Sequence, residues 1–320
     1  MVFSWENWHA AAMLHVPYRG SGPYCYANSL AMMMGVDAPE PAVIETVTGS
    51  PFGMQLVGGA LPFFDPYGWT PETGVQDALA ALGWTARTLS DGEPGAALGR
   101  LASLLEAGPV MVGPIEMGHL RYQPGMTGPI GADHYLVAVG IERDHLTVHD
   151  PQGYPYARLP LPDFMNAWRA HTLTYGRPYT TRTEFTRLAR VSADAAITAV
   201  LPRAVAWLAA EPTHPMPAGS LANGDAALAL ADLLDAGDND VREHLVHFAI
   251  RVGARRLTDA ATCLHRAGFT DAAATIDRQA RLVGSLQQSV VTGDTPTAVD
   301  TLRALAPTYD NLRTDLQHSL

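Results

Sequence analysis

The pattern of hydrophobic and polar positions changes often over roughly the first 180 residues. Short apolar runs alternate with stretches rich in Gly, Pro and aromatic residues, which is typical of a fold that mixes short helices and strands. Helical patterns cover residues 24–35, 41–48, 73–82, 95–107 and 161–170, and strand-like runs cover 85–89 and 109–113. The stretch 49–69 has no clear period and predicts a long structured loop.

The clearest strand pattern in the chain lies at residues 134–142 and 145–150. These two apolar runs, HYLVAVGIE and HLTVHD, are joined by only two residues, Arg143 and Asp144. A two-residue connection between strand-like runs predicts a β-hairpin, and the sequence DPQG after it predicts a turn. Because the two strands of a hairpin are antiparallel, we expect His134, at the start of one strand, to lie beside Asp150, at the end of the other.

The pattern becomes helical beyond residues 180–195. Ala and Leu dominate there, apolar positions recur at helical spacing, and Gly or Asn-Gly marks the breaks. Helices are expected at 194–210 (kinked or split at Pro202), 225–236, 240–252, 259–268, 271–286 and 295–306. The sequence therefore predicts two domains, a mixed α+β domain at 1–185 and a helical bundle at 186–320. The bundle is open to three roles: a lid, a docking platform, or the interface of a homodimer.

Composition and charge exclude several classes of function. The net charge is −11, so the basic field that nucleic-acid binding needs is missing and no nucleic-acid partner is expected. No apolar run approaches the ~18–20 residues of a membrane span, and the N-terminus lacks the basic and apolar regions of a signal peptide, so we expect no membrane partner and a cytoplasmic protein. The sequence has no phosphate-binding or dinucleotide motif, and its two cysteines are too few for a thiolate zinc site. We therefore expect no metal and no cofactor.

Cys25 is the first candidate for chemistry. It follows the segment RGSGPY and begins a predicted helix, where unpaired N–H groups and the helix dipole favour a thiolate. His134 would act as its base and Asp150 would orient the imidazole, which is the general order of a nucleophilic triad. Each residue alone also has a structural interpretation, as a buried thiol, a core histidine and a turn former. Cys263 lies among Ala and Leu within a predicted helix, and we expect it to be a core residue.

Two segments are candidates for substrate or partner contacts. The segment PIEMGHLRYQPG, just before the hairpin, supplies Glu116, His119 and Tyr122, and predicts either a loop that lines a cleft or a plain surface loop. The aromatic stretch 63–69 predicts either the wall of an acyl pocket or the cover of a core.

A third segment carries positive charge in an otherwise acidic chain. Arg182, Arg187 and Arg190 predict either a local basic patch that docks a carrier protein or a solvated linker.

Two motifs carry a resemblance to a known family. The segments GPYCYANSLAMMMG and ADHYLVAVGIERDHLTVHDPQGYP resemble the Cys-box and the His/Asp-box of C39-type papain-like peptidases. The whole chain resembles the family of the butirosin biosynthesis protein H N-terminal domain, with its helical C-terminal extension. The resemblance implies a papain-like (C39-like) cysteine-protease fold of the α+β class for about residues 1–180, followed by an all-α helical domain.

The same resemblance implies a function in natural-product, and specifically antibiotic, biosynthesis. Members of the family include an acyltransferase that moves an aminoacyl group from a carrier-protein thioester onto an aminoglycoside amine. An acyl carrier protein or another acyl thioester is therefore the expected partner, with phosphopantetheine as an arm borne by the substrate rather than a cofactor of this chain.

One departure from the papain-like pattern affects the choice of reaction. Such peptidases usually place a Gln about six residues before the nucleophile as an oxyanion donor, and here that position is Arg19. The backbone N–H of Cys25 remains, and Arg19, Ser21 and Gln55 are candidates for the second donor. Each oxyanion donor contributes ~10²–10³ in rate, and a thioester is more reactive than a peptide, so the departure weakens a peptidase more than an acyl-transfer enzyme.

Three functions follow in order. The first is acyl transfer from a thioester, as an acyltransferase, cyclase or thioesterase. The second is a C39-like cysteine peptidase. The third is a catalytically inactive binding protein with the same fold, in which Cys25 would be unreactive.

Overall fold

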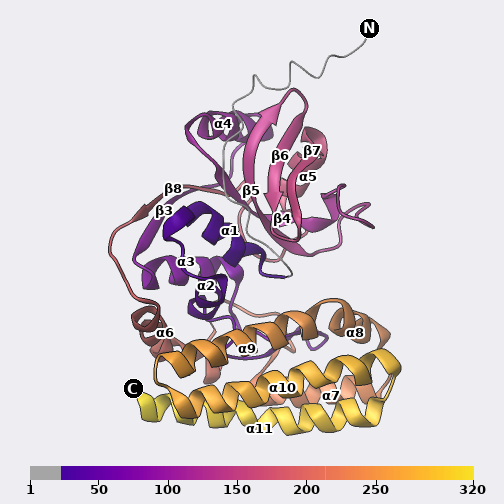
Figure 1. Cartoon of the computed structure of the whole chain (residues 1–320). Coiled ribbons are helices and arrows are strands. Elements are labelled where there is room, and N and C mark those ends of the chain that lie inside the picture. The colour runs from indigo at the N-terminus through magenta and orange to yellow at the C-terminus, as the bar shows by residue number, and fades with distance from the viewer. Residues whose placement is uncertain (1–22, 213) are drawn as a thin grey trace. The chain divides into compact units, whose positions relative to one another are not determined.

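The chain folds into two compact units (Figure 1). The computed structural model describes residues 23–212 and 214–320. The first unit contains residues 23–38 and Thr85–Arg187, and the second contains Pro39–Trp84 and Leu188–Leu320. The expected domain boundary at 185 falls close to the division after Arg187, but residues 39–84 group with the C-terminal unit. The N-terminal unit is therefore discontinuous in sequence, unlike the continuous 1–185 that was expected.

The first unit is built on a six-stranded sheet in the order β3-β8-β4-β5-β6-β7. The strands are β3 (Trp84–Leu89), β4 (Val110–Glu116), β5 (Asp133–Glu142), β6 (His145–Asp150), β7 (Tyr154–Pro160) and β8 (Thr181–Arg187). The predicted hairpin is confirmed, since β5 pairs antiparallel with β6 and Glu142 lies opposite His145. Strands β7 and β8 were not predicted. The prolines in YPYARLP obscure a strand pattern, and they are tolerated because β7 is an edge strand.

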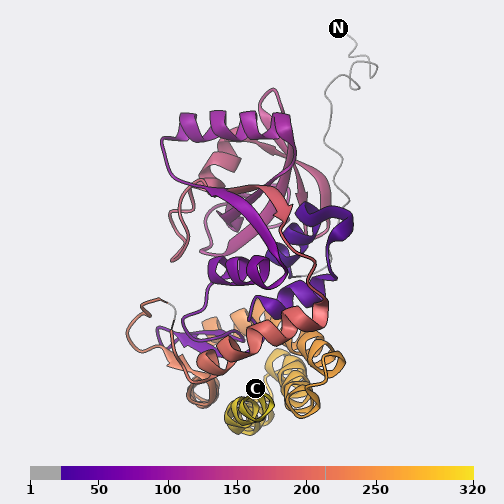
Figure 2. The same ribbon diagram turned by 90° about the vertical axis from the view of Figure 1, so that its left-hand side faces the viewer.

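Helices cover both faces of this sheet (Figures 1 and 2). They are α1 (Cys25–Met34), α4 (Pro94–Ala107) and α5 (Leu161–Arg169). Helices α4 and α5 pack in one core cluster with Leu136 and Ala138 of β5. Met32 of α1 packs against Val137 and Val139, which alternate with those residues along β5 and therefore face the other way. The two apolar faces of β5 thus fix α1 on the opposite side of the sheet from α4 and α5.

The second unit is mainly helical, with a small three-stranded sheet in the order β2-β1-β9. Its elements are α2 (Pro41–Val47), β1 (Gln55–Val57), β2 (Leu61–Phe63), α3 (Pro71–Ala81), α6 (Ala193–Leu208), β9 (Leu221–Ala222), α7 (Asn223–Asp235), α8 (Asn239–His244), α9 (Ile250–Arg266), α10 (Thr270–Thr292) and α11 (Thr295–Ser319). Helices α9, α10 and α11 run side by side (Figure 1).

Three expectations about this unit were wrong. The stretch 49–69 is not only a loop, because it contains β1 and β2, whose three residues each are too short to show a period. The break expected between 252 and 259 is absent, because α9 is continuous there and a π-helical turn (Leu245–Ala249) joins α8 to it. Helix α6 continues through Pro202 without splitting.

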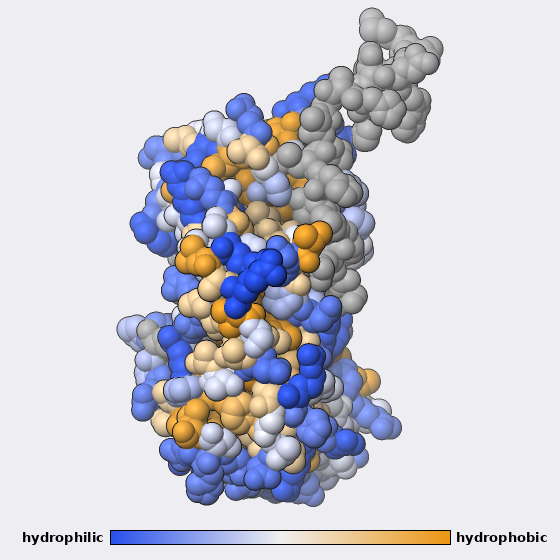
Figure 3. Space-filling model, turned by 60° about the vertical axis from the view of Figure 1, so that its left-hand side comes forward, coloured by the Kyte–Doolittle hydropathy of each residue, from blue (hydrophilic) through white to orange (hydrophobic). Residues whose placement is uncertain are grey.

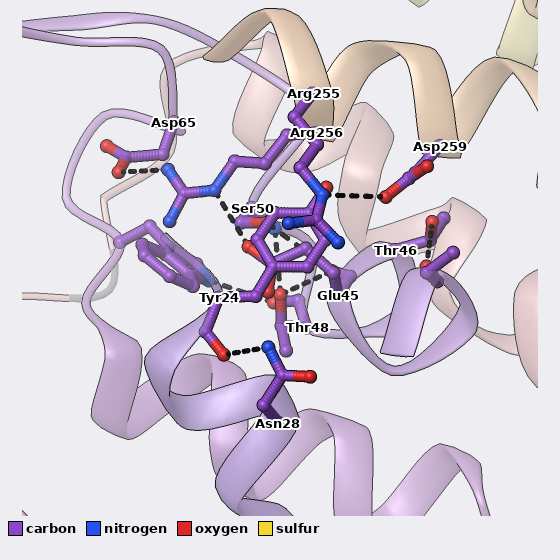
Figure 4. A network of polar contacts seen from close by, with 12 residues as sticks. Tyr24, Asn28, Glu45, Thr46, Thr48, Ser50, Asp65, Arg255, Arg256 and Asp259 are labelled. Carbon is purple, nitrogen blue, oxygen red and sulfur yellow. Dashed lines mark hydrogen bonds and ion pairs between the residues drawn. The ribbon is translucent and has the colours of Figure 1, made fainter. Parts of the chain in front are cut away.

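A buried ion-pair network explains why residues 39–84 belong to the helical unit (Figure 4). The Arg256 guanidinium on α9 lies 2.7 Å from Glu45 Oε1 on α2 and 3.0 Å from Asp65 Oδ2. Ser50 Oγ also donates to Glu45 at 2.9 Å, and the Arg256 guanidinium lies over the Trp69 ring. Because buried charges are stable only when paired, this network ties the early segment to α9.

The surface shows no apolar feature that a membrane would require. None of the helices in residues 23–212 and 214–320 is long and apolar enough to cross a bilayer. Figure 3 shows hydrophilic and hydrophobic side chains intermixed on one face. Scattered exposed apolar side chains are normal on folded proteins and do not by themselves indicate a binding site.

Candidate active site

The packing of α1 along β5 brings Cys25 beside His134. The Tyr26 ring meets the Tyr135 ring edge-on, with centroids 6.0 Å apart, while Met32 packs further along β5. The six helical residues from Tyr26 to Met32 advance ~9 Å, and two to four strand residues advance ~7–13 Å, so helix and strand run in the same direction. The first residues of the two elements are therefore neighbours.

The imidazole of His134 lies between the thiol of Cys25 and the carboxylate of Asp150. Its Nε2 donates to Asp150 Oδ1 at 2.8 Å, and the Cys25 thiol is a hydrogen-bond partner of the same ring. Because Asp150 occupies Nε2, Nδ1 is the nitrogen that faces the thiol. The His134 side chain is 1% exposed and Cys25 is 8% exposed. The structure thus brings together the three residues that the sequence singled out, in the order thiol, imidazole, carboxylate.

Cys25 is the first residue of α1. The residue before it, Tyr24, makes no side-chain cap to the helix, and the first turn contains no acidic residue. The free backbone N–H groups and the positive end of the helix dipole therefore act on the thiol without competition from a nearby carboxylate in that turn. This environment favours a negative charge on sulfur.

Four hydrogen bonds surround the Asp150 carboxylate. Oδ1 accepts from His134 and from the backbone N–H of Gln152, each at 2.8 Å. Oδ2 accepts from the Tyr122 hydroxyl at 2.8 Å and from Gln123 Nε2 at 2.7 Å. Burial by itself would raise the pKa of Asp150, but the charge of His134 and these hydrogen bonds together lower the pKa to about 2. Asp150 is therefore ionised throughout the physiological range.

The charge on Asp150 determines the state of His134. Burial tends to lower the pKa of His134, whereas the charge and hydrogen bond of Asp150, and then the contact with Cys25, hold that pKa well above its usual value. A histidine that stays protonated beside a thiol stabilises a thiolate–imidazolium pair.

The segment before the hairpin supplies contacts within the protein. Tyr122 bonds Asp150, as described above, and its ring also meets the Tyr154 ring. Glu116 is buried and accepts hydrogen bonds from the backbone N–H groups of Gly118, Ile130 and Gly131, and from the Thr172 hydroxyl. His119 is half-buried and ends the short 3₁₀ turn Met117–His119.

Two contributors to this site were not singled out from the sequence. Gln123 follows Tyr122 directly, and its amide could have been noticed as a second donor in the same segment. Gln152 lies in the predicted turn DPQG, where an Asp side chain that accepts from the N–H two residues later is a common turn former. That rule would have indicated that Asp150 is anchored by its own turn.

The candidates for a second oxyanion donor are not brought to Cys25 by any described contact. Arg19 and Ser21 lie outside the described residues. Gln55 belongs to the second unit, where its Nε2 donates to Asp65 Oδ1 at 2.7 Å and its Oε1 accepts from the backbone N–H of Gly68. Its amide is therefore engaged within that unit.

The predicted basic patch was wrong for two of its three arginines. Arg182 is 2% exposed and donates to the Gly113 carbonyl at 3.0 Å, and Arg187 pairs with Asp37 at 3.0 Å. These arginines satisfy groups within the first unit rather than forming a free surface.

The other expectations about side chains concern cores and metals. In the aromatic stretch 63–69, Phe64 and Trp69 are buried in the second unit, so this stretch covers a core. Cys263 is buried too, and burial raises the pKa of its thiol. Within the described part of the chain, no group of three or more His, Cys, Asp or Glu side chains is arranged to hold a metal ion.

Comparison with known proteins reaches mainly the second unit. Residues 217–317 match a family described as the YobF C-terminal domain. An uncharacterized protein, YobF of Bacillus subtilis (strain 168), is 32% identical over 166 residues, which cover 49% of this chain and 52% of that relative. The match therefore spans about half the length of the curated relative. The family match runs from just before β9 to nearly the end of α11, and it includes none of Cys25, His134 and Asp150.

Proposed function

We propose that this protein is a cysteine-dependent acyl-transfer enzyme, with a papain-like (C39-like) fold in its first unit, that acts on an acyl thioester of a carrier protein or coenzyme A. One observation carries the proposal: the buried His134 hydrogen-bonds Asp150 on one side and Cys25 on the other. A thiol at a helix N-terminus beside an oriented, charged imidazole has the environment that an attacking thiolate requires.

The proposed reaction has two transfers. In the first, the Cys25 sulfur bonds to the acyl carbon, the bond from that carbon to the donor sulfur breaks, and His134 gives its proton to the departing thiolate. In the second, an acceptor amine attacks the acyl-cysteine, its proton passes to His134, and the Cys25 thiolate is released. Water or an internal nucleophile in place of the amine would give a thioesterase or a cyclase. The backbone N–H of Cys25 is one oxyanion donor, since the first N–H groups of a helix have no partner within it.

Two arguments favour a thioester over a peptide as substrate. The usual Gln is replaced by Arg19 at the oxyanion position, and thioesters need less electrophilic assistance than amides. The family resemblance adds a carrier protein as donor, with phosphopantetheine as its arm, and a place in natural-product biosynthesis.

The test is acylation of Cys25 followed by intact mass spectrometry. The full chain is incubated with a panel of acyl-coenzyme A and acyl-N-acetylcysteamine thioesters, and the adduct is located by peptide mapping. All 21 of its Lys and Arg residues are arginines, so no lysine amine competes for the acyl group. We expect one adduct, lost in Cys25→Ser and kept in Cys263→Ser, the matched control at the other buried thiol.

Two outcomes would overturn the proposal. An adduct that survives Cys25→Ser would assign the reactivity elsewhere. No adduct and no turnover over the whole panel would favour one of the rival functions. Cleavage of unactivated peptides would then indicate a peptidase, and an inert Cys25 would indicate a binding protein.

A further inference from the structure

The loop between β4 and β5, residues 117–132, is closed at its base. Glu116 and Asp133 lie opposite each other in the β4–β5 ladder, and the N–H of Met117 donates to the Ala132 carbonyl at 2.9 Å. A compact loop whose ends meet in this way is an Ω-loop, a type that frequently carries functional residues.

The Glu116 carboxylate holds both legs of this loop. Its Oε1 accepts from Gly118 N and Ile130 N, each at 3.0 Å, and its Oε2 accepts from Gly131 N at 3.0 Å. The Thr172 hydroxyl donates to Oε2 from outside the loop. Burial would raise the pKa of Glu116, but these hydrogen bonds lower it, so the clamp is anionic and its hydrogen bonds are charge-assisted.

The two legs also touch each other. A Cβ atom on Gly118 would lie 1.9 Å from the Gly128 carbonyl oxygen, so this close approach requires glycine. Leu120 is fully buried in the core below the loop, and Arg121 Nη1 donates to the Met126 carbonyl. The residues that follow Leu120 are therefore presented by a fixed base.

Those residues are Tyr122 and Gln123, and both donate to Oδ2 of Asp150. This is the carboxylate oxygen that His134 and the Gln152 N–H do not use. A buried anion that lost these donors would be desolvated without compensation on one side, and its plane would be free to turn away from the imidazole.

We propose that Tyr122 and Gln123, held by the Glu116-clamped loop, are positioning residues that keep Asp150 ionised and oriented so that it directs His134 at Cys25. This inference rests on the proposed function. Neither side chain needs to touch the substrate, because both act through Asp150.

The test compares Tyr122→Phe, Gln123→Met and the double variant with the unmodified protein. The first removes one hydroxyl and the second replaces an amide with an apolar side chain of similar length. We measure the rate of Cys25 alkylation by iodoacetamide against pH, together with kcat and KM for the best thioester. Thermal unfolding checks that each variant folds.

We expect the double variant to lower alkylation and kcat about 10–100-fold with little change in KM, because hydrogen bonds to a charged group are lost and no substrate contact is removed. The acid limb of the alkylation profile should move to higher pH, because the carboxylate then binds a proton more readily. The titratable groups that face this carboxylate are His134, Tyr122 and, beyond the ring, Cys25. Glu116→Gln should shift the same limb in the same direction, through the loop.

The matched control is Tyr156→Phe, a similar change on β7 at a ring that is 45% exposed and packs on His149. It should leave both rate and profile unchanged. If the unmodified protein is reactive and Tyr122→Phe and Gln123→Met match it in rate and acid limb, the positioning role is wrong and the proposed function stands. If the unmodified Cys25 reacts no faster than a free thiol and transfers no acyl group, the proposed function itself fails.

Discussion

His134 Nε2 and Asp150 Oδ1 lie 2.8 Å apart, and both side chains are almost completely shielded from solvent. The β5–β6 pairing produces this contact, because Val137 lies opposite His149 and the residues that extend the two strands therefore converge. A buried carboxylate so close to the ring fixes the tautomer and favours the protonated imidazole.

Removal of the charge on Asp150 should change the pH dependence of Cys25. In Asp150→Asn the amide oxygen still accepts from Nε2, but the negative charge that raises the pKa of His134 is gone. The pKa of His134 should fall, so the thiolate–imidazolium pair is lost at lower pH and the basic limb moves down. The measurement is the alkylation rate of Cys25 by iodoacetamide between pH 4 and pH 10.

Asp144→Asn is the matched control for that experiment. Asp144 belongs to the turn of the same hairpin and lies 2.8 Å from His145, but its side chain is exposed. Its neutralisation should leave the profile of Cys25 unchanged. A basic limb that stays in place in Asp150→Asn would show that Asp150 does not govern the charge of His134.

The same carboxylate should contribute to stability against acid. Asp150 has a pKa of about 2 in the folded chain, below the ordinary 3.8 that we assign to the unfolded chain. A lowered pKa stabilises the folded state above the unfolded value, and that stabilisation, about 2 kcal/mol, is lost as the pH falls from about 4 through about 2. Urea unfolding of the wild type and Asp150→Asn at pH 6 and pH 2.5 measures it. An equal loss of free energy of unfolding in both proteins would contradict it.

The sequence predicted contacts that are close along the chain better than contacts between distant segments. The hairpin that unites His134 with Asp150 spans a short stretch, so its alternation and two-residue turn were sufficient. The approach of Cys25 depends on α1 packing against β5, a distant contact that a single pattern does not encode and that the family resemblance suggested.

The misplaced residues have a common physical cause. Arg182 was expected on a surface because a charged side chain usually stays in water, yet it is buried against a carbonyl that no pattern could reveal. Glu116 was expected to face a substrate, but it accepts hydrogen bonds from its own loop. Residues 39–84 join the second unit through Glu45 and Arg256, which are 211 positions apart. Each case is a polar group satisfied by a partner that only the folded chain supplies.

The Arg256 network should be a major source of stability for the second unit (Figure 4). Arg256→Met would leave Glu45 and Asp65 buried without the cation that both of them contact. Removal of one partner from a buried ion pair costs about 3–5 kcal/mol. We expect a loss of that size in the free energy of unfolding, measured by urea denaturation followed by circular dichroism of the helices.

Arg281→Met is the control for this loss. Arg281 pairs with Asp277 one turn away on α10 at 2.7 Å, but its side chain is 78% exposed. An exposed pair contributes less than about 1 kcal/mol, because water and salt screen it. Equal effects of the two substitutions would mean that Arg256 is not desolvated in the folded protein.

Gly49 should tolerate no side chain. Its φ is +84°, a conformation that favours glycine, and a Cβ atom there would lie 1.8 Å from the Trp207 ring, which is buried on α6. Gly49→Ala would therefore strain the backbone and displace the indole, at a cost of about 2–4 kcal/mol. The free energy of unfolding of the second unit measures this cost, with Trp fluorescence as a report on the indole.

Gly284→Ala offers the opposite expectation within the same unit. Gly284 lies inside α10, and its added Cβ would meet only the Ala254 Cβ at 3.8 Å, an ordinary contact. Alanine in a helix interior should stabilise this unit by about 0.5–1 kcal/mol, because it restricts the unfolded chain and suits the helix. If both substitutions shifted the unfolding transition in the same direction, the close packing of α6 against residue 49 could not be the cause, since only one of the two sites meets an obstructing ring.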